Sequence, residues 1–308
     1  MRADPDPPLL APAGGGPGRR VAGAVLPYAL RASLLVSPRP AALLVRHVFA
    51  KGGAATAERL QAHAPADVRS TVDERYGEEP DMLLDVHRPA SPDEPLPLIV
   101  WVHGGAWVGG SKEEVAGWCR VLASHGYAVV APRYGLAPEH RYPTAPRHVM
   151  AAIDHVVRAA GRLGVDADRI VVGGDSAGAQ IAAQLGAIVT TPRYAGAVGV
   201  APGIGPSQVR ALVLACGPYD LGLASAIASP AGRGLVHAVL WAYSGKRRYA
   251  DDRVFGLASV VHHVTPAFPP SLVTVGNADP LRPHSEPLDE GLRAVSYTHL
   301  TLPTNSRV

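Results

Sequence analysis

The sequence predicts an α/β fold in which helices cover both faces of one mostly parallel central sheet. Three observations predict it. From residue 70 onward, short apolar runs alternate with longer stretches of helical period, as crossover connections between parallel strands require. The run LPLIVWVH at 96–103 is continuously apolar, which is typical of a strand buried on both faces. The chain has 308 residues, 47% of them hydrophobic and 18% charged, which suffices for one large domain or two small ones.

The elements of this fold follow one another along the chain. Strands are expected at 82–89, 96–103, 127–134, 169–176, 208–218 and 270–279. Helices are expected at 113–126, 144–164, 177–190 and 287–294, and the first two end at Gly126 and Gly164. Residues 219–268 interrupt this rhythm, and we predict a helix around 235–244 that helps to wall a pocket.

The chain before residue 70 is expected to lie outside the core. Residues 1–20 are rich in proline and glycine and predict a disordered lead-in. Residues 21–69 predict an N-terminal helical cap segment, with two short helices on either side of the Pro-Arg-Pro break at 38–40, packed over the mouth of the core. Arginines interrupt its apolar run, so no integral membrane span is expected, whereas contact with a membrane surface stays open.

Charge and cysteine usage exclude other classes of protein. The net charge is +3 without any long run of like charges, so nucleic acid is not an expected partner. Cys119 and Cys216 have no metal-ligand spacing, and we expect two small buried residues in a reducing compartment, hence a cytoplasmic protein. The pair His262 and His263 lacks a third ligand at a suitable spacing, so no metal site is predicted. The sequence does not predict an oligomeric state.

The motif GDSAG at 174–178 carries the prediction of catalysis. It is a G-x-S-x-G that ends an apolar strand and begins a helix, the context in which a nucleophilic serine is expected. We therefore predict that Ser176 is the nucleophile on an elbow formed with Gly174, Asp175 and Gly178. The two glycines are required because side chains there would clash with neighbouring elements.

A second motif, HGGAW at 103–107, directly follows the buried strand at 96–103. Glycines in such a loop let backbone amides approach a substrate closely. We predict an oxyanion hole from the segment Gly104, Gly105 and Ala106 together with Ala177, whose amide lies at the positive end of a helix.

These two motifs and four further segments resemble successive blocks of the hormone-sensitive-lipase-like branch of the α/β-hydrolase fold, a group of carboxylesterases. The four segments are YGLAPEH at 134–140, YP at 142–143, DRI at 168–170 and DPL at 279–281. The resemblance covers residues from about 70 to 293. It implies that Ser176 is the nucleophile, that Asp279 orients the catalytic histidine, and that His103 supports the oxyanion loop without acting as the base. Independently, Asp279 follows a predicted strand at its carboxyl end, where such sheets build their sites, although a helix cap or turn is the alternative role.

The chain departs from the family pattern at two positions. Ala106 replaces the usual third glycine, which is tolerable because only a backbone amide is needed there. Gly135 replaces the usual arginine, which removes a buried charge near the pocket and leaves the local geometry open.

The catalytic histidine is the missing member of the predicted site. In this fold it lies beyond one further helix and one further strand after the acid, and it accepts the serine proton. Residues 295–308, VSYTHLTLPTNSRV, contain neither alanine nor glycine and predict neither a helix nor a final strand. We interpret 70–294 as the hydrolase core and 295–308 as a non-native tail resembling adapter read-through, with the histidine lost and an open sheet edge that destabilises the chain. His299 is the candidate base if the tail is native, and His284 lies too close to Asp279 in the sequence.

These observations predict a serine hydrolase that cleaves a small uncharged carboxylic ester through an acyl-enzyme at Ser176. This chemistry requires no metal or organic cofactor. Two alternatives stay open: an arylformamide or amide hydrolase of the same fold, and a catalytically dead fragment or binding module without its histidine.

Overall fold

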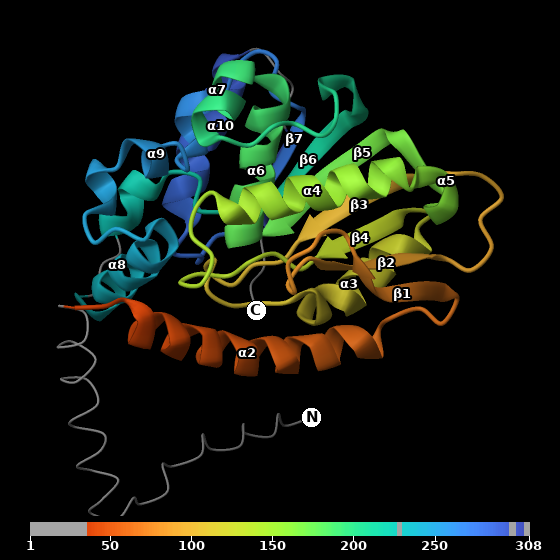
Figure 1. The fold of residues 1–308 in the computed structure, drawn as a ribbon, viewed down its shortest axis with the longest axis horizontal. Helices are drawn as coiled ribbons and strands as arrows, with labels where there is room; N and C mark the ends of the chain where they lie inside the picture. Colours follow the sequence, from red (N-terminus) through yellow and green to blue (C-terminus); the bar gives the residue numbers. More distant parts are fainter. Residues whose placement is uncertain (1–35, 227–229, 296–299, 305–308) are drawn as a thin grey trace, which may run out of the picture.

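The computed structural model describes residues 36–226, 230–295 and 300–304. Within them, eight strands form one sheet in the order β1-β2-β4-β3-β5-β6-β7-β8, with helices packed on both faces (Figure 1). The pairs β1/β2 and β2/β4 are antiparallel, and every other neighbouring pair is parallel. The predicted fold class is thereby confirmed.

The strands lie close to the predicted ranges. Their bounds are β1 Val68–Arg75, β2 Leu83–Pro89, β3 Leu96–Val102, β4 Ala128–Pro132, β5 Val165–Asp175, β6 Val209–Ala215, β7 Ser271–Gly276 and β8 Leu300–Thr304. Strand β1 was not predicted, because VRSTVDER is largely polar and its residues are mostly exposed at the sheet edge.

The helices connect these strands and cover the sheet. The α-helices are α2 Arg39–Ala62, α3 Lys112–Ser124, α4 Thr144–Arg158, α5 Ala160–Leu163, α6 Ala177–Thr190, α7 Pro192–Val198, α8 Pro230–Ser244, α9 Arg253–Gly256 and α10 Arg282–Ala294. Short 3₁₀ helices are η1 Pro206–Gln208, η2 Leu221–Ala226, η3 Tyr249–Asp251 and η4 Val260–His263. The predicted helix at 144–164 is two helices, α4 and α5, and the one predicted at 287–294 begins five residues earlier, at Arg282.

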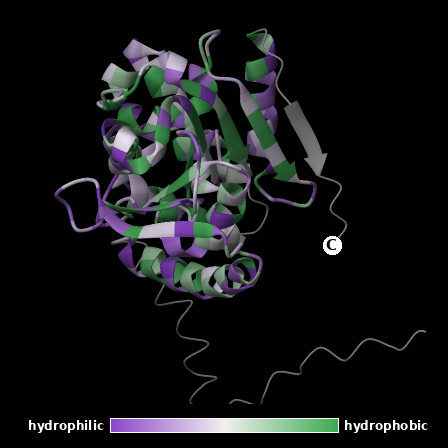
Figure 2. Ribbon diagram, turned by 90° about the vertical axis from the view of Figure 1, so that its right-hand side faces the viewer, coloured by the Kyte–Doolittle hydropathy of each residue, from purple (hydrophilic) through white to green (hydrophobic). Residues whose placement is uncertain are grey.

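The core divides into two layers, one on each face of the sheet. In β3, Leu98 and Val100 belong to the larger cluster, whereas the alternate residues Ile99 and Trp101 belong to the smaller one. This period of two follows from the pleat of a strand, which sends successive side chains to opposite faces. Hydrophobic colours accordingly dominate the central strands in Figure 2.

The cap segment differs from the prediction. Its described part is a single helix, α2, which runs alongside α3 and reaches α8 (Figure 1). The Pro-Arg-Pro sequence at 38–40 does not separate two helices; it begins one, because Pro40 lies in the first turn, where its missing N–H has no intrahelical acceptor. Arg46 fixes α2 to the core by donating to the carbonyl oxygens of Val108 at 2.6 Å and Ala137 at 2.7 Å. The predicted lead-in at 1–20 and the cap residues 21–35 lie outside the described residues.

The C-terminal segment also departs from the prediction. Residues 300–304 form β8, which pairs in parallel with β7 from Leu272↔Leu300 to Gly276↔Thr304. The expectation of no final strand was therefore wrong, and β7 is not an open edge. The physical reason is that an unpaired parallel edge offers a full set of backbone partners, and a proline is tolerated in the strand at the outside of the sheet.

The helices of the described residues do not include one that is both long and apolar enough to cross a bilayer.

Candidate active site

Ser176 occupies a sharp turn between β5 and α6. Its backbone has φ 52° and ψ −121°, and its N–H donates to the carbonyl of Ala215 at 2.8 Å. A positive φ is strained for a residue with a side chain, and such strain is typical of functional positions. The turn places the serine at the carboxyl ends of the parallel strands.

The two flanking glycines permit this turn to lie against the end of β3. A Cβ on Gly174 would be 2.4 Å from the carbonyl oxygen of Val102, and a Cβ on Gly178 would be 2.0 Å from the same atom. Both distances are far below van der Waals contact, so any side chain would push α6 away from the sheet. This is the steric reason that the sequence predicted.

The loop after β3 is held by a buried histidine. His103 stacks on Tyr134 with ring centroids 4.3 Å apart, and its Nδ1 donates to the carbonyl of Gly104 at 2.8 Å. Burial lowers the pKa of His103 to about 4, so the ring is neutral at pH 7. The Tyr134 hydroxyl donates to the His103 carbonyl at 2.9 Å. The His103 ring therefore supports the loop through its hydrogen bond and its stacking contact.

The loop itself adopts an unusual backbone. Gly105, Ala106 and Trp107 all have positive φ, at 116°, 52° and 58°. Gly104 packs against the Asp175 carboxylate, since a Cβ on Gly104 would be 2.4 Å from Asp175 Oδ2. This contact fixes the start of the loop, and the role of Gly104 in the oxyanion hole stays a prediction.

The remaining predicted donors have no protein acceptor. In the described part of the chain, the N–H groups of Gly105, Ala106 and Ala177 make no hydrogen bond to the protein. Ala106 and Ala177 line one cavity with Ser176, and Gly105 lines another with the same serine. These three N–H groups can therefore donate hydrogen bonds to a negatively charged oxygen beside the serine.

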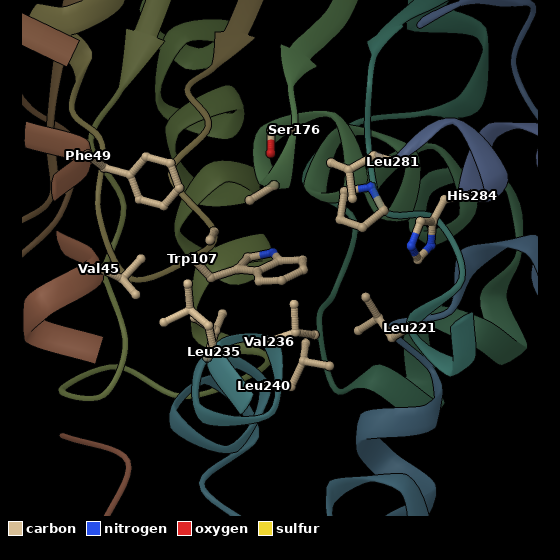
Figure 3. A pocket seen from close by; sticks show the side chains of 14 residues that line it. Val45, Phe49, Trp107, Ser176, Leu221, Leu235, Val236, Leu240, Leu281 and His284 are labelled. Atoms are coloured by element: carbon tan, nitrogen blue, oxygen red, sulfur yellow. The ribbon is translucent and has the colours of Figure 1, made fainter. Parts of the chain in front are cut away.

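Two cavities meet at Ser176. The first, which we call the apolar pocket, has a volume of about 200 Å³ and lies between α2, α8 and the loop after β3 (Figure 3). Its lining residues are Val45, Phe49, Ala106, Trp107, Ser176, Ala177, Pro218, Leu221, Leu235, Val236, Val239, Leu240, Leu281 and His284. The second, which we call the acidic pocket, has a volume of about 580 Å³ and lies between α2, α3 and the His103 loop.

Trp107 forms a fixed wall of the apolar pocket. Its indole N–H donates to Gln180 Oε1 at 3.1 Å, and Gln180 Nε2 donates to the Ala258 carbonyl at 2.7 Å. The ring also stacks on Tyr243 with centroids 4.8 Å apart. Gln180 was not predicted, although its place one turn into the helix after Ser176 was a usable signal.

Asp279 lies in the loop after β7, at the predicted edge of the sheet. Its Oδ1 accepts from the N–H of Leu281 at 2.8 Å, and its own N–H donates to Gly276 O at 3.1 Å. In the described part of the chain no histidine contacts it. The structure therefore shows the turn interaction that was the alternative role, at a position that also suits the catalytic one.

The histidines beside Ser176 do not bond to it. Among the described residues, His284 lines the apolar pocket, is buried, and has no partner for its Nδ1 atom. Burial lowers its pKa below the ordinary value. In the view of Figure 3, the side chain of Leu281 lies between His284 and Ser176. His299 lies outside the described residues.

The two cysteines differ in their surroundings. Cys119 is buried, as predicted, whereas Cys216 is only partly buried. Cys216 directly follows β6 with φ 44°, close to Ser176 and Asp279, and burial raises the pKa of its thiol. Its position at the end of a predicted strand was the signal that could have placed it at the site.

Comparisons with known proteins show which proteins this chain resembles. The chain matches the BD-FAE family model over residues 84–290. Esterase LipC of Mycobacterium tuberculosis is 32% identical over 230 residues, which are 73% of this chain and 55% of LipC. Carboxylesterase NlhH of the same species is 39% identical over 104 residues, which are 33% of each chain. The chain thus spans about half the length of LipC and less of the other curated relative.

Solved esterases share the fold. An esterase from Pyrobaculum calidifontis superposes with a TM-score of 0.67 and 28% identity, covering 85% of this chain and 82% of that one. Esterase B from Lactobacillus rhamnosis superposes with a TM-score of 0.74, covering 86% and 84%, and at 23% identity it shows the fold alone.

Proposed function

Because the chain belongs to the BD-FAE family, in the hormone-sensitive-lipase-like branch of the α/β-hydrolase fold, we propose that it hydrolyses carboxylic esters through an acyl-enzyme on Ser176. The observation that carries the proposal is the strained Ser176 turn where two pockets meet, with unpaired amides around it. LipC and NlhH, named as an esterase and a carboxylesterase, support the same chemistry.

The proposed reaction begins with attack of Ser176 Oγ on the ester carbonyl. The carbonyl oxygen gains negative charge and accepts hydrogen bonds from the amides of Gly105, Ala106 and Ala177. Each such donor typically contributes about 10²- to 10³-fold in rate. The alcohol leaves with a proton, and water then releases the acyl group from the serine.

The apolar pocket suits the hydrocarbon part of the ester. Its walls are aliphatic and aromatic side chains, and the fixed Trp107 ring gives it a rigid surface. Burying such a group against these walls stabilises binding by about 25 cal/mol per Å² of apolar surface.

The proton of Ser176 requires a base. This sequence offers two histidines beyond Asp279, namely His284 and His299. His284 is the candidate that the structure describes, and it lines the same pocket as Ser176. His299 is the candidate of the sequence analysis and lies outside the described residues.

Covalent labelling tests the proposal. A fluorophosphonate probe should label the chain at one site, and Ser176→Ala should abolish the label while leaving the thermal unfolding transition in place. Turnover of a short p-nitrophenyl ester, compared with an arylformamide, then separates an esterase from an amide hydrolase.

A binding module is the second candidate, because no histidine contacts Ser176 or Asp279 in the described part of the chain. Its signature would be a folded chain that neither reacts with the probe nor turns over either substrate. That result would overturn the hydrolase proposal.

A further inference from the structure

The acidic pocket beside Ser176 has no role in the chemistry described so far. It is larger than the apolar pocket, at about 580 Å³ against about 200 Å³, and Ser176 and Phe49 line both. A group attached to the reacting carbonyl would therefore extend into one pocket while the rest of the substrate occupies the other.

The distinguishing side chain of this pocket is Glu114, in the first turn of α3. Its carboxylate lies where a side chain on Gly53 of α2 would lie, since a Cβ there would be 2.2 Å from Glu114 Cδ. The absence of a side chain at Gly53 thus makes room for a charged group between two helices. Burial raises the pKa of Glu114, and the negative charges of Asp175 and Glu113 raise it further.

Glu114 has no cationic partner in the described part of the chain. The contrast with its neighbour is direct, because Glu113 pairs with Lys112 at 2.9 Å. Lys112 is already shared among three carboxylates, those of Asp73, Asp85 and Glu113. A half-buried carboxylate without a cation, beside a second carboxylate, is stabilised by any positive charge that enters the pocket.

The remaining polar groups of the pocket include one buried acceptor, on His103, and the indole N–H donors of Trp101 and Trp118, which lack a hydrogen-bond partner among the described residues. His103 is 2% exposed, and because its Nδ1 carries the proton, its Nε2 is an acceptor, which has no partner among the described residues. The rings of Phe49, Trp101 and Trp118 also line the pocket. Carboxylates combined with aromatic faces form the usual environment of ammonium groups in proteins.

We propose that the acidic pocket binds a positively charged group of the substrate, an ammonium or quaternary ammonium carried on the acyl or the alcohol side of the ester. The inference rests on the proposed ester hydrolysis and narrows its substrate class. The sequence predicted an uncharged ester, because Glu114 has no motif that distinguishes it from a solvated residue at a helix start.

Two pairs of isosteric substrates test the inference. One pair is acetylthiocholine and the thioester in which a tert-butyl group replaces the trimethylammonium group. The other pair consists of the p-nitrophenyl esters of trimethylammoniobutyric acid and of its tert-butyl isostere. We expect kcat/KM to be about tenfold higher for the cationic member of at least one pair.

Variants assign the preference to the pocket. Glu114→Gln should bring the ratio of cationic to neutral kcat/KM close to one. The matched control is Glu58→Gln, which removes the same charge from an exposed position of α2 and should leave both rates unchanged. A calorimetric titration with benzyltrimethylammonium provides a readout independent of turnover, with an expected loss of binding of at least tenfold in Glu114→Gln.

The outcomes separate the two proposals. Equal rates within both pairs, or a cationic preference that survives Glu114→Gln, would overturn the acidic-pocket inference while ester hydrolysis stands. Loss of Ser176 labelling and of all turnover would overturn the proposed function. The calorimetric titration alone would then show whether the acidic pocket binds a cation.

Discussion

Gly178→Ala is the sharpest test of how the nucleophile is positioned. The added Cβ would lie 2.0 Å from the carbonyl oxygen of Val102 and 2.6 Å from that of His103. Both obstacles are backbone atoms, so no side-chain rotation relieves them, and α6 must move by about 1 Å to restore contact distance. We expect a loss of about 3 kcal/mol in the free energy of unfolding, at the upper end of the cost of overpacking.

The assay is thermal and urea unfolding together with the rate of fluorophosphonate labelling. A loss of about 3 kcal/mol corresponds to a Tm lowered by about 6 °C or more in a domain of this size. Labelling should slow as well, because the shift of α6 moves Ser176 and the Ala177 amide relative to the His103 loop.

Gly196→Ala is the matched control. Gly196 is an exposed residue of α7, and a Cβ there meets nothing within 4 Å. Alanine favours the helix over glycine by about 0.5–1 kcal/mol, so this variant should be slightly more stable. Equal effects of the two substitutions, or a Gly178→Ala protein that melts and reacts like the parent, would refute the steric argument.

Three further predictions concern the supports of the site. Lys112→Met removes the cation 2.8 Å from the buried Asp85 carboxylate, and urea denaturation should show a loss of about 3–5 kcal/mol; a loss under about 1 kcal/mol would show that the ion pair is not needed. Arg46→Ala removes both hydrogen bonds that fix α2 to the core, so limited proteolysis of α2 should accelerate by about tenfold, whereas the exposed Arg59→Ala should match the parent. Burial lowers the pKa of His87 from 6.5 to about 4, so between these pH values the unfolded chain binds a proton that the folded chain does not. The free energy of unfolding should therefore fall as the pH drops through this window, by up to about 1.4 kcal/mol per pH unit. His87→Gln should flatten this pH dependence, and an unchanged slope would exclude His87 as its source.

Much of the fold could be predicted from the sequence because the patterns that indicate its strands and helices are local. The strand β3 and the helix α6 were predicted to within a residue, since a continuous apolar run and a helical repeat are properties of neighbouring residues. The strands at the two edges of the sheet were harder to predict. Strand β1 is polar and exposed, and β8 exists because β7 offers it a partner.

The cap helix shows the same limit. A sequence containing two adjacent glycines at 52–53 is a weak helix former, yet α2 continues through them to Ala62. Its packing against α3 explains this, because a Cβ on Gly117 of α3 would be 2.7 Å from the backbone of Leu60. Tertiary contact of this kind overrides local propensity, and no window along the chain reveals it.

The sequence by itself determined the elbow of Ser176, the glycine loop after β3 and the class of fold, because each depends on residue types at fixed local spacing. Only the tertiary structure decided that Gly104 packs against Asp175 and that His284 shares a pocket with Ser176. It also decided that Glu114 lines a pocket with Ser176 and has no cationic partner among the described residues. The physical reason is that these facts depend on distances between side chains from different elements. Such distances are set when the sheet and its helices pack, and no periodic pattern in the sequence indicates them.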